Sequence, residues 1–209
     1  LGYLLLTKRQ DHIGQHLSPH NQKRKIVTII RYYVNKMQVS LNPKGLQEWE
    51  GSVLVIGVFE GQVDKKIESL KSILKKEPLE VKLKQQKFSG KLAQSISFQL
   101  LEEKCLEKLV FVGLGLPEKL LLDDIRQAAC IGARASSGYK GTIGMLFPWD
   151  AFNPSTVAKA VGEAMRLSTF KDLRFKSDPD EIIYPDKLEL VGLDISDNQF
   201  LEEINPICA

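Results

Sequence analysis

The sequence predicts an α/β domain with a mixed, largely parallel sheet and helices on both faces. Apolar runs without polar alternation occur at residues 52–59, 109–112 and 141–147, and such runs are typical of strands covered on both faces. Each run is followed by a segment in which apolar residues recur at helical spacing. Strands that alternate with helices in this way favour parallel crossover connections.

The central unit is a strand, a glycine turn and a long helix within residues 106–135. We interpret Gly113 and Gly115, which follow the strand, as turn-forming residues. Asp123 is the predicted N-cap of the helix, and Gly138 is expected to end it. The predicted inner stripe of the helix consists of Leu121 or Leu122, Ile125, Ala128, Ala129, Gly132 and Ala135.

The chain before this unit predicts two strands, a helix and a third strand. Residues 38–41 form a short strand, and residues 52–59 form a continuous apolar one. Apolar residues recur at helical spacing over residues 63–74, with lysines on the opposite face. Residues 94–101 alternate between apolar and polar, so we expect a half-exposed strand that pairs antiparallel.

The chain after the central unit continues with a strand at residues 141–147. Asn153 is the predicted N-cap of the next helix, with Pro154 at its first position. Residues 177–180 predict a turn, and residues 187–192 predict a last strand before a helix capped by Ser196. The inner stripe of the helix after Asn153 consists of Val157, Val161, Ala164, Met165 and Ser168.

Composition divides the chain into three parts. Residues 1–36 are interpreted as a basic leader, disordered or a non-native extension, with seven basic side chains against one acid, Asp11. Met37, the first methionine, is interpreted as the natural start of a domain at residues 37–193, and residues 194–209 begin a linker helix. The alternative for the leader is a basic arm that binds nucleic acid or anionic lipid.

The histidines and cysteines exclude several kinds of site. His12, His16 and His20 would align on one helix face as metal ligands, but Gly14 and Pro19 would break that helix. With no histidine after position 20, the domain cannot host a Ser-His-Asp triad or a histidine zinc site. The three cysteines, Cys105, Cys130 and Cys208, are interpreted as reduced, packing thiols of a cytoplasmic protein.

Two patterns of glycine and acidic residues resemble ligand sites but depart from them at decisive positions. Gly113-x-Gly115 suggests dinucleotide binding, but Glu118 occupies the position of the third glycine and would oppose a pyrophosphate. Asp178, Asp180 and Glu181 lack the glycine and the downstream glutamate of a calcium loop. The adjacent acidic pairs are interpreted as helix-end charges: Glu102-Glu103, Asp123-Asp124 and Glu202-Glu203.

Residues 65–91 are rich in lysine. We interpret them as a solvated face of mixed charge, and a phosphate-binding face is the alternative. The nine lysines of this span are Lys65, Lys66, Lys71, Lys75, Lys76, Lys82, Lys84, Lys87 and Lys91.

The order of several short segments resembles the N-terminal domain of the leucyl (cytosol) aminopeptidase family, and is most similar to cyanobacterial and plant members. The match extends from Met37 to Ala209, and the leader has no counterpart. The matching segments are Val58-Phe59-Glu60-Gly61, Phe88-Ser89-Gly90-Lys91, the strand and turn from Leu109 to Gly115, Leu122-Asp123-Asp124-Ile125-Arg126-Gln127-Ala128, Gly162-Glu163 and Arg174-Phe175-Lys176-Ser177.

The resemblance implies a macro-domain-like α/β fold and a parent enzyme that removes N-terminal residues, such as leucine, from peptides. In that family two divalent metals, zinc or manganese, activate the attacking water, and a C-terminal domain holds them. That domain would begin near Asn205, where this chain stops, so no catalytic, cofactor-binding or metal residue is carried over. We expect the chain alone to be inactive.

The implied partners are the C-terminal catalytic domain of the same enzyme and the other subunits of a homo-hexamer. Peptide substrates would be reached only through the catalytic domain, and we expect neither membrane nor nucleic acid as a partner. The alternative is a free-standing module that binds a nucleotide in a macro-like cleft, or nucleic acid on the lysine-rich face at residues 65–91.

Overall fold

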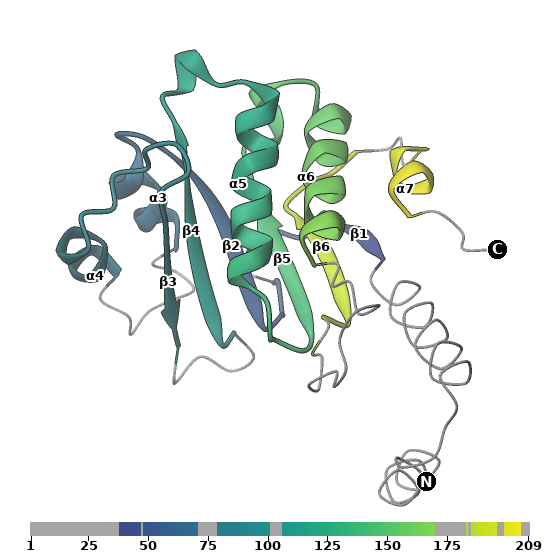
Figure 1. The fold of residues 1–209 in the computed structure, drawn as a ribbon, viewed down its shortest axis with the longest axis horizontal. Coiled ribbons are helices and arrows are strands. Elements are labelled where there is room, and N and C mark those ends of the chain that lie inside the picture. Colours follow the sequence, from purple (N-terminus) through teal and green to yellow (C-terminus); the bar gives the residue numbers. More distant parts are fainter. Residues whose placement is uncertain are drawn as a thin grey trace, which may run out of the picture.

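The computed structural model describes residues 38–46, 48–70, 79–100, 106–169, 183, 185–195 and 199–205. Its six strands are β1 (Val39–Asn42), β2 (Val53–Phe59), β3 (Ser95–Gln99), β4 (Lys108–Gly115), β5 (Thr142–Leu146) and β6 (Lys187–Val191). They form one sheet in the order β1-β6-β5-β2-β4-β3 (Figure 1). All neighbours are parallel except β3 and β4, which are antiparallel, so the predicted mixed, largely parallel sheet is confirmed.

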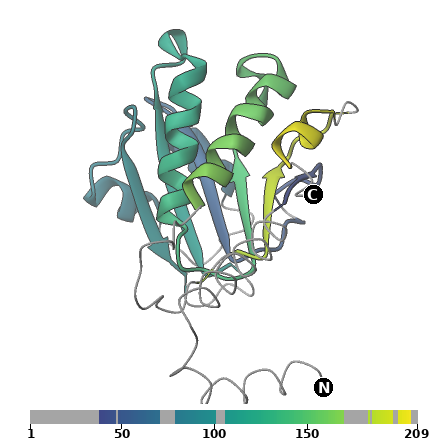
Figure 2. The same cartoon turned by 45° about the vertical axis from the view of Figure 1, so that its right-hand side comes forward.

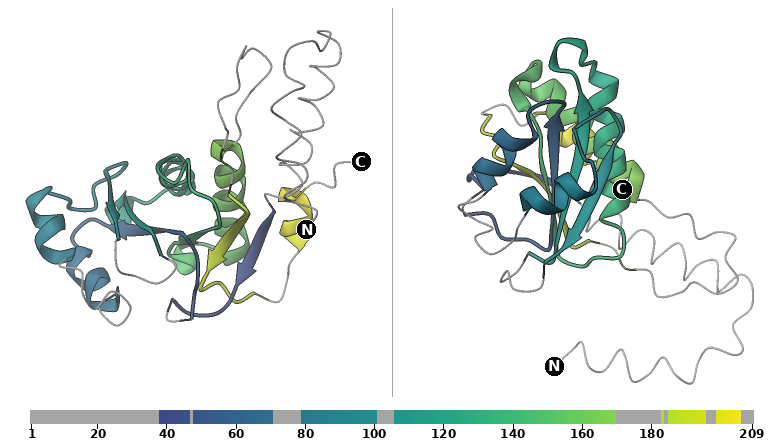
Figure 3. Two further views of the ribbon diagram at one scale, coloured as in Figure 1. Left: turned by 90° about the horizontal axis from the view of Figure 1, so that it is seen from below. Right: turned by 90° about the vertical axis from the view of Figure 1, so that its left-hand side faces the viewer.

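Helices lie on both faces of this sheet, as predicted. On one face α5 (Leu122–Ala135) and α6 (Pro154–Thr169) pack side by side (Figure 2). On the other face lie α3 (Val63–Leu70) and α4 (Leu79–Gln85), and Figure 3 (right) shows the sheet between the two layers. Two short 3-10 helices, η1 (Pro117–Lys119) and η2 (Trp149–Ala151), follow β4 and β5. The last described helix is α7 (Gln199–Ile204).

The two layers explain why the central strands have no polar alternation. In β2, Val53 and Val55 belong to the core under α5 and α6, whereas Leu54 and Ile56 belong to the core under α3 and α4. In β3 only one side is buried, and its exposed residues are Ser95, Ser97 and Gln99. The predicted half-exposed antiparallel strand is therefore confirmed.

Of the two predicted helix N-caps that the structure describes, one is confirmed and the other is wrong. At α6 the Asn153 side chain accepts a hydrogen bond from the Thr156 N–H at 3.2 Å, as an N-cap does. At α5 the N-cap is Leu121, whose N–H donates to the Asp124 carboxylate at 2.8 Å. Asp123 lies inside the first turn and pairs with Arg126 at 2.6 Å. The helix therefore begins earlier than predicted, because Asp124 reaches back to bind the free N–H of Leu121.

The two glycines after the central apolar run have different roles. Gly115 has a φ of +75°, so it is a turn-forming residue as predicted. Gly113 lies within β4, and a Cβ at this position would stand 1.9 Å from the Lys91 carbonyl oxygen. Its N–H also donates to the Gln94 carbonyl at 2.7 Å. The turn interpretation of Gly113 is therefore wrong, since this glycine allows the loop around Gly90 and Lys91 to approach the strand.

Helix α7 closes the free edge of β1. The Asn205 side chain, just after α7, accepts a hydrogen bond from the Val39 N–H at 2.9 Å and donates to the Val39 carbonyl at 2.7 Å. The amide thus takes the place of a neighbouring strand's peptide group at an exposed sheet edge. On its other side α7 is joined to α6 by the ion pair of Glu203 and Lys159.

We expect Asn205→Ala to lower the free energy of unfolding by about 1–2 kcal/mol, because two backbone groups of β1 lose their partner. Urea denaturation would measure the loss, and hydrogen exchange should show faster exchange at the Val39 amide. Lys159→Gln is the matched control, since it removes only an exposed ion pair, worth about 0–1 kcal/mol. An equal loss in both variants would contradict an edge-capping role for Asn205.

Several predictions fall outside the described residues. They concern the leader at 1–36 with its histidines, the helix beyond Leu70, the turn at 177–180, the Ser196 cap, Cys105, Cys208, Glu102-Glu103 and the acidic residues Asp178, Asp180 and Glu181.

Candidate functional site

A cleft of about 660 Å³ opens at the carboxyl ends of β2, β5 and β6. The arrowheads of β5 and β6 in Figure 2 mark this edge of the sheet. One wall is formed by the end of β2, by Gln62, and by the side of α3 that carries Lys65, Lys66 and Ser69. The opposite wall is the connection from β5 to α6, residues 147–150, with Gly192 after β6.

The cleft lies where the connections of two adjacent parallel strands diverge. From β2 the chain leaves over one face of the sheet, through α3 and α4, toward β3 and β4. From β5 it leaves over the opposite face, through α6, toward β6. In open α/β sheets, ligands bind in the crevice that such a change of direction creates at the carboxyl ends of the strands.

Tight packing fixes the floor and one wall of the cleft. The Trp149 indole N–H donates to the Val191 carbonyl at 2.9 Å, and its ring lies 6.3 Å from that of Phe147. A Cβ on Gly57 would stand 3.0 Å from a methyl group of Leu114 and 3.2 Å from the Phe147 ring. The cleft is therefore bounded by residues whose positions are set by the core.

The α3 wall carries positive charge. The half-buried Lys66 ammonium makes no hydrogen bond or ion pair with any residue that the structure describes. Burial withdraws this ammonium from water and lowers the pKa of Lys66 below its ordinary value. Lys65 adds a second, exposed ammonium, while Asp150 places one carboxylate on the opposite wall. An anionic group would fit best on the α3 side.

The structure separates the lysines that the sequence presented as one face. Lys65 and Lys66 line the cleft, whereas Lys82 lies over the Phe98 ring at 5.8 Å and Lys84 is exposed on α4. Lys87 and Lys91 are exposed in the loop before β3. The family resemblance suggested a nucleotide cleft as an alternative, but no residue could be assigned to one, because the second wall, residues 147–150, lies far along the chain. Two adjacent lysines soon after a buried strand were the available signal.

The other candidate residues that the structure describes do not line this cleft. Gly115 and the exposed Glu118 are absent from its lining. Cys130 is half-buried in α5, and its thiol lies 3.9 Å from the Ala164 carbonyl, which agrees with a packing role. Within the described part of the chain, no three His, Cys, Asp or Glu side chains come together as metal ligands. Among the same residues, no helix has the length and apolarity needed to cross a bilayer.

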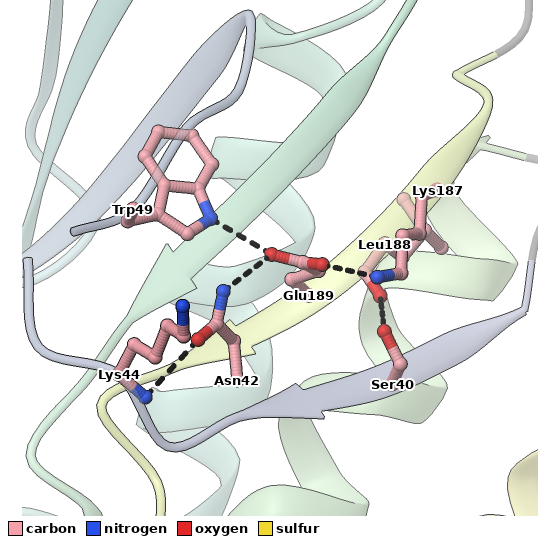
Figure 4. A network of polar contacts seen from close by, with 7 residues as sticks. All are labelled: Ser40, Asn42, Lys44, Trp49, Lys187, Leu188 and Glu189. Carbon is pink, nitrogen blue, oxygen red and sulfur yellow. Dashed lines mark hydrogen bonds and ion pairs between the residues drawn. The ribbon is translucent and has the colours of Figure 1, made fainter.

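A second polar cluster surrounds the buried Glu189 carboxylate on β6 (Figure 4). One carboxylate oxygen accepts hydrogen bonds from the Trp49 indole at 2.9 Å and from the Asn42 amide at 3.0 Å. The other oxygen lies 2.5 Å from the Lys187 ammonium. All four groups have partners within the cluster, so we assign it a structural role: it fixes the segment between β1 and β2 to the sheet.

Comparison with known proteins connects the chain to one family. Residues 55–179 match the family model described as the cytosol aminopeptidase family, N-terminal domain. Two curated relatives from Prochlorococcus marinus, each named a probable cytosol aminopeptidase, are 44% and 46% identical over 173 residues. A relative of the same name from Synechococcus sp. is 40% identical over 174 residues. These alignments include 83% of this chain but 35% of each relative, so the chain spans about a third of their length.

Solved structures agree on the fold. A mutant of tomato leucine aminopeptidase superposes with a TM-score of 0.66 at 20% sequence identity, over 81% of this chain and 35% of that one. The bottromycin maturation enzyme BotP in complex with Mn gives a TM-score of 0.50 at 14% identity, over 73% of this chain and 28% of that one. At these identities the likeness concerns the fold alone.

Proposed function

Because the chain belongs to the cytosol aminopeptidase family, as its sequence predicted, we propose that it is the non-catalytic N-terminal domain of a leucyl aminopeptidase-like enzyme. The parent enzyme would remove N-terminal amino acids from peptides in the cytoplasm. This domain would contribute to assembly, in a homo-hexamer, and to access of peptides to the active site.

The observation that carries the proposal is the position of the match. The chain aligns with 35% of each relative, and the family model that it matches is that of the N-terminal domain. The remaining length of those relatives is where the proposal places the catalytic domain. As part of the proposal, residues 1–36 would be a leader, residues 37–193 the family domain, and residues 194–209 the start of a linker helix to the catalytic domain.

Two divalent metals, manganese or zinc, belong to the catalytic domain in this proposal. The described residues do not fit such a pair of ions, because they offer no cluster of three acidic, histidine or cysteine ligands. In this proposal no catalytic or metal-binding residue is assigned among the described residues, and no chemical step is derived there. In this proposal the role of α7 would be to fix the C-terminal segment of the domain to the edge strand β1, through Asn205.

We expect this polypeptide to release no p-nitroaniline from leucine p-nitroanilide, with or without added Mn²⁺ or Zn²⁺. In a chimera, the matched segment would replace the corresponding 173 residues of a Prochlorococcus marinus relative. We expect this chimera to be active. Release of p-nitroaniline and the mass of the assembly would be measured in parallel. The relative with its segment deleted is the control, and it should lose both properties.

Two outcomes would contradict the proposal. Metal-dependent turnover by this polypeptide alone would mean that it contains an active site. A folded chimera that assembles like the relative but is inactive would mean that this domain cannot take the place of the N-terminal domain of an active aminopeptidase.

A further inference from the structure

We propose that the cleft between β2, α3 and the β5–α6 connection binds a small phosphate-bearing ligand of nucleotide size. This site is separate from the peptidase activity proposed above and does not depend on it. Three features of the described residues support the inference: the size and position of the cleft, its unpaired ammonium group, and the different character of its two walls.

The volume suits a small molecule. About 660 Å³ lies within the range of roughly 300–1,000 Å³ that is usual for ligand sites. The cleft also lies at the change of direction between β2 and β5, which is where open parallel sheets bind ligands. The packing of Gly57 against Phe147 and the hydrogen bond of Trp149 keep its floor in place without a ligand.

The α3 wall is suited to an anion. Lys66 is half-buried, and its ammonium has no partner among the described residues, whereas Lys159 and Lys187 are both paired with a carboxylate. A partly buried, unpaired charge is unfavourable until a counter-charge reaches it. With Lys65 beside it, two ammonium groups face one side of the cleft, which is the arrangement that a phosphate or diphosphate would neutralise.

The opposite wall differs in character. Pro148 presents apolar surface there beside the nearly buried Phe147, and Asp150 adds a hydrogen-bond acceptor. An inorganic anion would leave this side unused and would be repelled by the Asp150 carboxylate. A ligand with a phosphate at one end and an apolar ring with hydroxyl or amino groups at the other would contact both walls, and a nucleoside diphosphate has this form.

Isothermal titration calorimetry of the full chain would be carried out with ADP, with inorganic pyrophosphate and with adenosine. Pyrophosphate tests the phosphate end of the ligand, and adenosine tests the nucleoside end. We expect ADP to bind more tightly than either fragment, and to bind about five- to tenfold more weakly to Lys66→Gln, since a charged hydrogen bond is lost at a partly exposed site. Lys65→Glu should weaken ADP binding at least as much as Lys66→Gln does. Adenosine should bind both variants as tightly as it binds the wild type.

Lys84→Gln is the matched control, because Lys84 is an exposed lysine outside the cleft. It should leave ADP binding unchanged. Equal weakening by Lys84→Gln would overturn the proposal in favour of diffuse attraction to a basic surface, as would equal binding of ADP and pyrophosphate. Absence of measurable ADP binding at millimolar concentration would overturn it directly. Circular dichroism would verify that each variant is folded.

Discussion

Replacing Gly113 with alanine is expected to destabilise the domain by roughly 3–5 kcal/mol, at the upper end of what a single added methyl group does. The new Cβ would meet the Lys91 carbonyl oxygen at 1.9 Å and backbone atoms of Gly90 at 2.7 Å. Those atoms belong to a backbone that is itself held, because the Gly115 N–H donates to the Gly90 carbonyl at 3.0 Å. A rotamer change cannot relieve the contact, so the loop must separate from β4.

The loss would be measured as the shift in urea midpoint and in melting temperature. Gly45→Ala is the matched control, since a Cβ at this position meets nothing within 4 Å, and we expect a change of no more than about 0.5 kcal/mol. Because natural domains are stable by about 5–15 kcal/mol, Gly113→Ala should remove a large fraction of the free energy of unfolding. A variant as stable as the wild type would mean that the loop at residues 90–91 does not pack against β4.

The strands could be predicted from the sequence, because the burial of each strand determines which of its positions are apolar. In β2 and β4 every position except Phe59 and Lys108 is buried between the two layers, so the run of apolar residues shows both the strand and its central place in the sheet. The alternation in β3 likewise showed its half-exposed position. Helix α5 was located from its periodicity, but its first residue depended on a contact between Asp124 and Leu121 that spacing alone did not select.

The residues that form the cleft and the Glu189 cluster could not be predicted, because both sites assemble residues that are distant in sequence. Trp49 and Glu189 are 140 positions apart, and they meet because β6 lies beside β1 and β5 in the sheet. Lys66 and Trp149 likewise share a cleft only because parallel strands end at one edge. The strand prediction for residues 187–192 contained Glu189, but nothing local indicated that its side chain is buried.

We expect Glu189→Ala to lower the free energy of unfolding at pH 7 by about 2–4 kcal/mol, because it removes the acceptor of two donors at once. The buried Trp49 indole N–H would lose its 2.9 Å hydrogen bond, and the Asn42 amide its 3.0 Å hydrogen bond. Lys187 is half exposed and can return to water, so its contribution to the loss is small. Urea denaturation would measure the loss, and the Trp49 environment can be followed by fluorescence.

Glu189 should also make the stability depend on pH. Burial by itself raises the pKa of this carboxyl, but hydrogen bonds from Asn42, Lys187 and Trp49 outweigh that effect and hold the pKa below its ordinary value of 4.5. The unfolded chain therefore takes up the proton more readily than the folded one. The stabilisation from Glu189 is fully present above the ordinary pKa and is lost as the pH falls through the lower, folded value.

Glu189→Gln isolates this contribution, because glutamine can still accept a hydrogen bond from Trp49 but does not titrate. At pH 7 the wild type should be more stable than Glu189→Gln by about 1 kcal/mol, since the amide cannot pair with the Lys187 ammonium. That advantage should diminish once the pH falls below 4.5, whereas the other carboxylates affect both proteins alike. An advantage that stays constant or grows on acidification would show that the folded state does not favour the ionised carboxylate, and the hydrogen bonds of Trp49 and Asn42 would then be made to a neutral group.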